Sequence, residues 1–318
     1  MCKAPEIVFN KNTDNIFNET QEMYLGEAIA ETLEKNFRVV KDEEANCYLQ
    51  KVGAKLVEHL PPTSLKFQFH IIDTPELNAF ATAGGRIYIT RKMVAFLRSE
   101  SELAGILGHE LGHAVVRHVA TDISKQFKEI LKMEKLGDRE DIYRKYNELI
   151  DKRNTKRVSI SRGHQDNQQL EADQIGVFSM VAAGYDPEGF SSAWNRLTEI
   201  EGKTGNSFTD FLGSTRPEEK RLREILNAIK TIPSECVDKN MSASKEFEQW
   251  QTYIVTTSEF ARQEKLTAVV DKKTLSPYLR GDILHFQFSP DGQYIIAQDS
   301  SGINVLKREP FSFVFRIN

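Results

Sequence analysis

Residues 101–118, SELAGILGHELGHAVVRH, contain the sequence His109-Glu110-x-x-His113. On an α-helix, side chains four residues apart lie on one face, so the two histidines can bind one metal ion while Glu110 lies beside it. Burying histidines without a function is costly, and an apolar face predicts that this helix is buried. The apolar residues are Leu103, Ile106, Leu107, Leu111 and Ala114. The pattern is typical of zinc hydrolases, in which zinc activates a water molecule and Glu110 transfers its proton to the leaving amine. The alternative is a pair of hydrogen-bonded core histidines beside an unrelated glutamate.

The composition of the chain is that of an ordinary soluble globular protein. Its 318 residues are 40% hydrophobic and 28% charged, and the formal net charge is -4. The short basic runs are interleaved with acidic residues, so we expect no nucleic-acid binding. No apolar run is long enough to cross a bilayer, and we expect a soluble chain without a transmembrane segment.

The three cysteines, Cys2, Cys47 and Cys236, are too few and too far apart to predict a disulfide framework or a zinc site. Cys2 directly follows Met1, which suggests the lipid-modified first residue of a bacterial lipoprotein whose signal peptide was replaced by a start methionine. This interpretation predicts a location in the bacterial cell envelope or periplasm, with Cys2 as the anchor.

The residues before the motif predict helices and short strands. The helices span Thr20–Phe37 and Glu44–Leu60, and the strands span Leu65–Ile72 and Arg86–Thr90, with a turn at 84–85.

The segment with Asn78, Ala79 and Phe80 is the candidate substrate-binding strand. A free strand edge beside a zinc helix can hydrogen-bond an extended peptide backbone and hold the scissile bond over the metal. An ordinary hairpin in the core sheet is the alternative interpretation.

The motif helix is predicted to continue past His118 towards Leu131. His118 follows His113 by five residues, about 140° further around a continuous helix, so we do not expect it to bind the same metal. The highly charged residues 132–160 are predicted to form a mobile, solvated excursion. Such a segment is either a lid over the cleft or a charged helical hairpin.

A catalytic zinc ion usually has three protein ligands and a water, so a third ligand is expected after His113. The candidate element is a helix predicted over Gln165–Ala183. At this point the chain resembles the M48 family of zinc endopeptidases. Four groups of residues in the same order carry the resemblance: Asn78-Ala79-Phe80-Ala81 with Gly84-Gly85, His109-Glu110-Leu111-Gly112-His113 with Arg117-His118, Glu171-Ala172-Asp173 with Ile175-Gly176, and Gly184-Tyr185-Asp186-Pro187.

The resemblance covers roughly residues 20–230 and implies an α+β fold, a mostly helical zincin-type peptidase domain with a small β-sheet. It also implies one zinc ion per chain and protein or peptide substrates. In such enzymes the metal-binding Glu lies four residues before the Asp of the Ala-Asp pair, and here that position is Gln169. Asp173 shares its helix face and would accept a hydrogen bond from the other ring nitrogen of a ligand histidine.

Gln169 is the main departure from the family pattern. Glu171 is about 200° around the helix from Gln169 and should point away from the metal, so it is a poor replacement. A Gln carbonyl oxygen is a neutral ligand, which predicts weaker metal binding and a more positive site. Three explanations are open: a natural relative of low or no activity, a laboratory substitution, or a register slip in the alignment.

A second departure is Arg216-Pro217, where family members often carry a His-Pro pair. If Arg216 faces the cleft, it can meet a substrate carboxylate or the transition-state oxyanion. A surface helix with Pro217 at its first position explains the pair equally well. His164, in the loop before the third-ligand helix, is not expected to be a ligand.

The pattern changes near the C-terminus. Helices are predicted over Pro187–Thr198, Pro217–Ile229 and Ser242–Gln263, followed by four short strands: Ile283–Phe288, Gln293–Ala297, Ile303–Leu306 and Phe311–Phe315. The strands resemble one blade of a WD40-like or TolB-like propeller. One blade cannot close a propeller, so we expect a piece of a longer protein; a blade packed on the peptidase domain is the alternative.

The predicted organisation is therefore an N-terminal arm (1–18), a peptidase domain (19–235), a helical connector (236–277) and one truncated propeller-like blade (278–318). We expect a zinc-dependent endopeptidase, with the propeller recruiting a protein partner. The competing hypothesis, based on Gln169, is an impaired or inactive peptidase fold that serves as a binding scaffold. A third hypothesis is an enzyme kept closed by residues 132–160.

Overall fold

The computed structural model describes residues 14–74, 76–155, 165–199, 219–233 and 244–257, and four strands within 283–317. The chain divides into two units, Met1–Ser258 and Glu259–Asn318. Each unit is described separately below. Cys2, Cys236, His164 and Arg216 lie outside the described residues, as do 156–160 of the charged segment.

A mixed four-stranded sheet forms the centre of the first unit. Its strand order is β1-β2-β4-β3, and β2 and β4 are parallel while the two outer strands pair antiparallel. The strands are β1 (Arg38–Val39), β2 (Gln68–Asp73), β3 (Ala79–Ala81) and β4 (Arg86–Thr90). Because β3 is at the end of this order, no strand among the described residues pairs with its outer edge.

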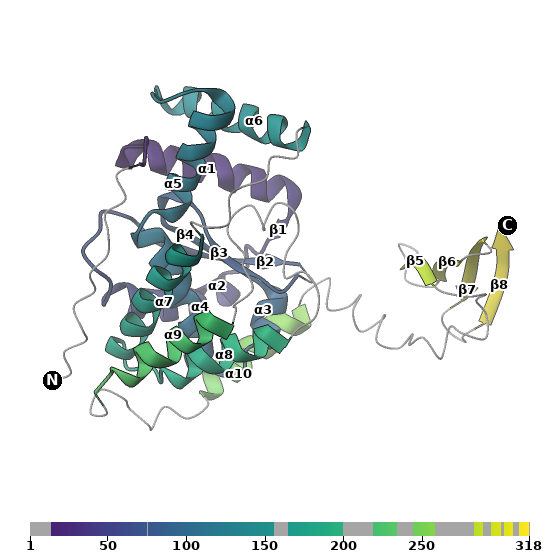
Figure 1. Ribbon diagram of the computed structural model, residues 1–318. Coiled ribbons are helices and arrows are strands. Elements are labelled where there is room, and N and C mark those ends of the chain that lie inside the picture. The colour runs from purple at the N-terminus through teal and green to yellow at the C-terminus, as the bar shows by residue number, and fades with distance from the viewer. Residues whose placement is uncertain are drawn as a thin grey trace. The chain divides into compact units, whose positions relative to one another are not determined.

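Alternate residues of this sheet enter two different hydrophobic clusters, as expected for a sheet covered on both faces. Ile71 and Ile87 pack on one side, and Ile72 and Tyr88 on the other. Figure 1 shows the two helical layers. The smaller layer contains α1 (Glu19–Asn36), α5 (His118–Gln126) and α6 (Arg139–Thr155); the larger contains α2 (Glu43–Val57), α3 (Arg91–Phe96), α4 (Glu100–Val115), α7 (Gln165–Ala182), α8 (Glu188–Glu199), α9 (Glu219–Lys230) and α10 (Lys245–Thr257). The predicted mostly helical α+β fold is confirmed.

Helix α4 carries the motif, and every residue from Ser101 to Val115 is buried. Two glycines allow close packing of α4 on α7. A Cβ at Gly112 would lie 2.7 Å from the carbonyl oxygen of Ala172, and a Cβ at Gly176 would lie 2.7 Å from the amide nitrogen of His109. The close approach brings the motif histidines against the side chains of α7.

The motif helix does not continue through His118, so that prediction is wrong. Arg117 has a φ of 62°, in the left-handed region, and a new helix, α5, begins at His118. A non-glycine residue in this region breaks the helical hydrogen-bond pattern. The angular argument that separated His118 from His113 therefore does not apply.

The charged segment after α5 contains a packed helix. Ile142, Tyr146 and Leu149 of α6 are fully buried and pack in the same cluster as α1. Their spacing of four and three residues gives α6 an apolar stripe despite its high charge. The prediction of a mobile, solvated excursion is wrong for residues 139–155.

The helix predicted within the connector packs on the first unit. Phe247, Trp250 and Ile254 of α10 are buried, and the Trp250 indole donates a hydrogen bond to the Ala45 carbonyl over 2.7 Å. Their spacing predicts one apolar face, which outweighs the polar remainder of this helix.

The second unit contains four strands in an antiparallel sheet of order β5-β6-β7-β8. They span Ile283–Phe288, Tyr294–Asp299, Gly302–Lys307 and Ser312–Ile317. The predicted all-β C-terminal segment is confirmed, and its assignment as a propeller blade stays a prediction.

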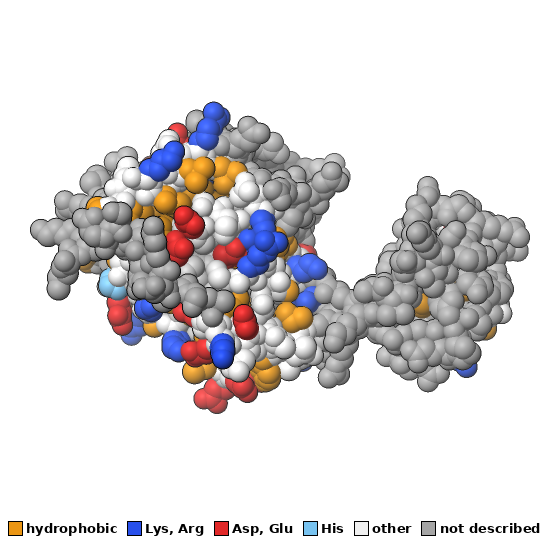
Figure 2. All heavy atoms as spheres, turned by 90° about the horizontal axis from the view of Figure 1, so that it is seen from below, with side chains coloured by type: hydrophobic (Ala, Val, Ile, Leu, Met, Phe, Trp, Pro, Cys, Tyr) orange, Lys and Arg blue, Asp and Glu red, His pale blue; other side chains and the backbone are white. Residues whose placement is uncertain are grey.

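The described surface and helices give two further observations. Acidic and basic side chains are interspersed on the face drawn in Figure 2. Among the described residues, no helix combines the length and the apolar character needed to span a bilayer.

Candidate metal centre

The two motif histidines converge on one point. Their Nε2 atoms are 3.1 Å apart, and both side chains are buried. Two imidazole nitrogens at about 2.0–2.1 Å from a tetrahedral zinc ion are roughly 3.3 Å apart, so this separation suits a shared metal.

Asp173 supports His109 from α7. Its Oδ1 atom lies 2.8 Å from Nδ1 of His109. Arg221 of α9 donates two hydrogen bonds to the same carboxylate, over 2.6 and 2.7 Å, and the Trp194 indole donates a third over 3.3 Å. Burial alone would raise the pKa of Asp173, but Arg221 and His109 hold it well below its ordinary value.

His113 has a different support. Its Nδ1 atom lies 2.9 Å from Nδ1 of His118, and Nε2 of His118 lies 3.1 Å from a carboxylate oxygen of Glu171. Burial, with the neighbouring His109 and His118, lowers the pKa of His113 well below its ordinary value, so its ring is neutral.

The donors and acceptors assign the ring protons. A carboxylate only accepts, so His118 donates from Nε2 to Glu171, and its Nδ1 accepts the proton of His113 Nδ1. By the same reasoning His109 donates from Nδ1 to Asp173. The two Nε2 atoms face each other in a buried site, and the guanidinium of Arg221 lies 3.3 Å from Nε2 of His109. Their separation, with the Nδ1 atom of each ring held by a partner on its other side, fits two histidines that share a metal ion.

Gln169, predicted at the third-ligand position, lies beside His113. It is buried and its side chain hydrogen-bonds to His113. No cluster of three or more His, Cys, Asp or Glu side chains with metal-binding geometry occurs in the described part of the chain. The donor set is therefore two imidazoles and one carboxamide, which fits a divalent metal but without a carboxylate ligand.

Glu110 lies between the motif helix and the sheet. Its Oε2 atom accepts a hydrogen bond of 2.9 Å from the backbone amide of Ala81, in the edge strand β3. Burial raises the pKa of Glu110 above its ordinary value, against the opposing effects of His109 and the Ala81 amide. A higher proton affinity brings this carboxylate closer to the range of a general base near neutral pH.

The sequence profile of peptidase family M48 matches residues 43–229, more than half of the chain. This chain belongs to peptidase family M48. The metallopeptidase chemistry of the family agrees with the donor set and with the carboxylate beside it.

Similar proteins include metallopeptidases from eukaryotes and bacteria. The mitochondrial metalloendopeptidase OMA1 of Schizosaccharomyces pombe is 27% identical over 186 residues, which cover 56% of this chain and 51% of the relative. The beta-barrel assembly-enhancing protease of Escherichia coli is 25% identical over 189 residues, 56% of this chain and 38% of the relative. The M48 chain thus matches about half or less of the length of these proteins.

The predicted substrate segment lies in the edge strand of the M48 domain and just before it. Phe80 and Tyr88 are stacked on the sheet face opposite α4, with ring centroids 5.3 Å apart, and Phe80 packs in the cluster that contains α1. Asn78 and Ala79 are buried, and the backbone of Asn78 pairs with Thr90. The Ala81 amide, which binds Glu110, lies on the edge of β3 that faces away from β4.

Sequence reasoning missed three residues of the M48 centre: His118, Trp194 and Arg221. His118 was excluded by the assumption of a continuous helix. Arg221 and Trp194 reach Asp173 across 48 and 21 residues of sequence, and no local pattern marks such long-range contacts.

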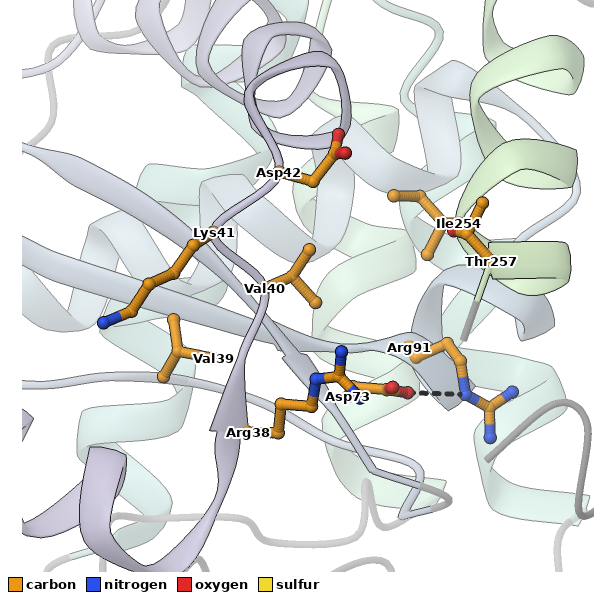
Figure 3. Close-up of a pocket in the computed structure, with 9 residues that line it drawn as sticks. All are labelled: Arg38, Val39, Val40, Lys41, Asp42, Asp73, Arg91, Ile254 and Thr257. Atoms are coloured by element: carbon orange, nitrogen blue, oxygen red, sulfur yellow. Dashed lines mark ion pairs between the residues drawn. The ribbon is translucent and has the colours of Figure 1, made fainter. Parts of the chain in front are cut away.

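Cavities in the described part of the M48 unit include one beside the centre and one away from it. One of about 290 Å³ lies between α7 and α9, beside the centre; Asp173 contributes to its wall together with apolar Leu170, Phe178 and Ile225. A larger cavity, of about 520 Å³, contains none of the centre's residues (Figure 3). Its wall includes the buried Asp73–Arg91 ion pair, which is 3.3 Å long.

Proposed function

We propose that this M48 chain is a zinc-dependent endopeptidase whose centre consists of His109, His113, Gln169 and Glu110. The convergence of the Nε2 atoms of His109 and His113, 3.1 Å apart on the helix that also carries Glu110, is the observation that carries this proposal. When bound, zinc supplies Lewis acidity that polarises a peptide carbonyl and lowers the pKa of water.

The protein's own residues would supply base catalysis and orientation. Glu110 would accept a proton from the attacking water and donate it to the leaving amine. Its hydrogen bond to the Ala81 amide fixes the carboxylate beside the edge strand. Asp173, itself held by Arg221, would accept the Nδ1 proton of His109 and orient its Nε2 towards the metal.

Strand β3 would bind the substrate backbone. In its pairing with β4, the backbones of Asn78 and Thr82 hydrogen-bond to Thr90 and Arg86. Backbone groups alternate along a strand, so those of Ala79 and Ala81 face the free edge. The Ala81 amide binds Glu110, which leaves the Ala79 amide and carbonyl for an extended peptide.

Ala79→Pro tests this binding mode, because proline removes the edge-facing amide without breaking the pairing with β4. We expect kcat/KM for an unfolded protein substrate to fall about tenfold, which corresponds to one lost hydrogen bond. Ala79→Ser keeps the amide and should cleave at the parent rate. Equal kcat/KM for both variants, at unchanged thermal stability, would show that the substrate does not use this edge.

Gln169 supports a competing function, a binding scaffold with an impaired centre. Glu110 and Asp173 carry two negative charges and Arg221 one positive charge. A dication would therefore leave this buried group with one excess positive charge, which a Glu at position 169 would neutralise. Burial of excess charge is costly, so the native chain should bind zinc more weakly than a family member with that Glu.

Gln169→Glu distinguishes the two functions. We expect zinc affinity, measured by competition with a chelator, to increase by roughly a hundredfold or more, since a ligand change should exceed the 10- to 100-fold effect typical of residues behind a ligand. Cleavage of an unfolded protein should increase in parallel. Gln168→Glu, one residue away on α7, is the matched control. If neither the native chain nor Gln169→Glu binds zinc, the proposed endopeptidase function is refuted.

The substrate would be a protein or peptide, and a protein partner would bind the second unit. The relatives are named for mitochondria and for beta-barrel assembly in bacteria. The bacterial cell-envelope location, with Cys2 as an anchor, remains a prediction from the sequence.

A further inference from the structure

Glu171 is connected to His113, although the proposed function gives Glu171 no role. A continuous hydrogen-bonded path joins Nδ1 of His113, both ring nitrogens of His118 and the Glu171 carboxylate, over distances of 2.9 and 3.1 Å. His118 is 2% exposed, whereas the Glu171 side chain is 29% exposed. A carboxylate near the surface is thus connected through one buried ring to a candidate metal ligand.

We propose that Glu171, acting through His118, is a positioning residue and charge partner of the metal centre, and compensates for the carboxylate that Gln169 lacks. This inference rests on the proposed function, because it requires zinc at His109 and His113.

Local backbone structure places the two residues. The left-handed conformation of Arg117 ends α4 and starts α5, so the His118 ring returns to His113 instead of following the face of a continuous helix. Gly112 allows the backbone of α7 to approach α4 at Ala172, next to Glu171. The pair therefore meets His113 on the side opposite to the ring nitrogen that would bind metal.

The path has an electrostatic effect on the metal-binding nitrogen. Glu171 draws the proton of His118 Nε2 towards itself, which makes His118 Nδ1 a better acceptor for the proton of His113. His113 Nε2 then becomes a stronger electron donor, as in other carboxylate–histidine–metal arrangements. With Glu171 counted, the three carboxylates, Arg221 and a dication sum to zero charge even with a neutral Gln169.

A purely structural role is the alternative, in which Glu171 only satisfies the N–H group of a buried histidine. The two roles predict a different dependence on residue 169 for the contribution of Glu171 to zinc affinity. Charge compensation matters while residue 169 is neutral and becomes largely redundant once it is a carboxylate. A structural hydrogen bond would contribute equally in both backgrounds.

The test is the zinc affinity of Glu171→Gln in the native chain and in the Gln169→Glu background, measured with full-length protein by chelator competition. Gln keeps an oxygen that accepts the His118 hydrogen bond and removes only the charge. We expect zinc affinity to fall about 10- to 100-fold in the native chain. In the Gln169→Glu background we expect a loss of no more than about threefold.

Glu248→Gln, an exposed carboxylate on α10, controls for a general effect of net charge, and the thermal stability of the metal-free proteins controls for misfolding. Equal losses of zinc affinity in both backgrounds, or no loss in the native chain, would overturn this inference but not the proposed enzymatic function. Zinc binding only after Gln169→Glu also overturns it, because Glu171 then fails to compensate. Absence of zinc binding in both backgrounds instead refutes the proposed function.

Discussion

His109 and His113 lie one helical turn apart on α4, yet the groups behind them differ in burial, charge and origin. Behind His109, the Asp173 carboxylate is almost completely buried and accepts two hydrogen bonds from Arg221 and one from Trp194. Behind His113, a second imidazole leads to Glu171, whose carboxylate is partly exposed. One histidine is thus held by a buried ion pair, and the other by a chain that reaches towards solvent.

A second buried carboxylate, which pairs with the residue before His118, shows how the completeness of ion pairing affects a pKa. Glu22 of α1 lies 3.4 Å from the guanidinium of Arg117, the residue that precedes His118. Burial raises the pKa of Glu22 to about 7, and the single contact with Arg117 does not offset it. Asp173, with two short hydrogen bonds from Arg221, has its pKa lowered instead. Burial of an acid next to an arginine therefore has opposite results, depending on how completely the charges are paired.

Asp173→Asn should cause the largest loss of stability among the substitutions that test this comparison. The substitution keeps the shape of the side chain but leaves the buried Arg221 guanidinium without a counter-charge. Removal of one partner of a buried ion pair costs about 3–5 kcal/mol, so we expect the free energy of unfolding to fall by about this amount. Urea unfolding of the metal-free protein measures it.

Glu246→Gln is the matched control, because Glu246 forms an exposed ion pair with Lys51 and its loss should change stability very little. If both variants lost equally little stability, the Asp173–Arg221 pair would not be holding α7 and α9 together. The two sides of the candidate metal centre would then not differ in how firmly their carboxylates are paired.

The sequence predicts the centre well where the determining geometry is local. His109 and His113 converge because residues i and i+4 share a helix face, and the same rule places Asp173 with Gln169 on one face of α7. The apolar stripe of the motif helix correctly predicts its burial. The edge position of β3 beside the motif helix agrees with a short strand and a glycine turn, although sequence alone does not distinguish it from an ordinary hairpin.

Sequence reasoning fails where a single backbone conformation or a contact between distant residues determines the position of a side chain. His118 is close to His113 only because Arg117 adopts a left-handed φ, which nothing in its residue type predicts. Arg221 pairs with Asp173 across the packing of α9 on α7. In α6 and α10, many charged or polar residues obscure short apolar stripes, and burial follows the stripes and not the average composition.

Glu22→Gln should have a smaller effect, and its sign depends on pH. Folded protein binds a proton at Glu22 between its ordinary pKa of 4.5 and the raised value of about 7, while the unfolded chain does not. The stability gained from this proton is complete below pH 4.5 and is lost as the pH rises through 7. Relative to native protein, Glu22→Gln should therefore become more stable by about 3 kcal/mol between pH 4.5 and pH 8.

Urea unfolding at several pH values measures this relative change, and Glu19→Gln is the matched control. Glu19 contacts the same arginine as Glu22, with Nη2 of Arg117 3.2 Å from its carboxylate, but it is exposed. Burial causes the raised pKa of Glu22, so Glu19→Gln should keep the native pH dependence. Parallel pH profiles for native protein and Glu22→Gln would mean that Glu22 stays ionised beside Arg117. A single contact with Arg117 would then be enough to offset the burial of Glu22, and the completeness of pairing would not explain why Glu22 and Asp173 differ.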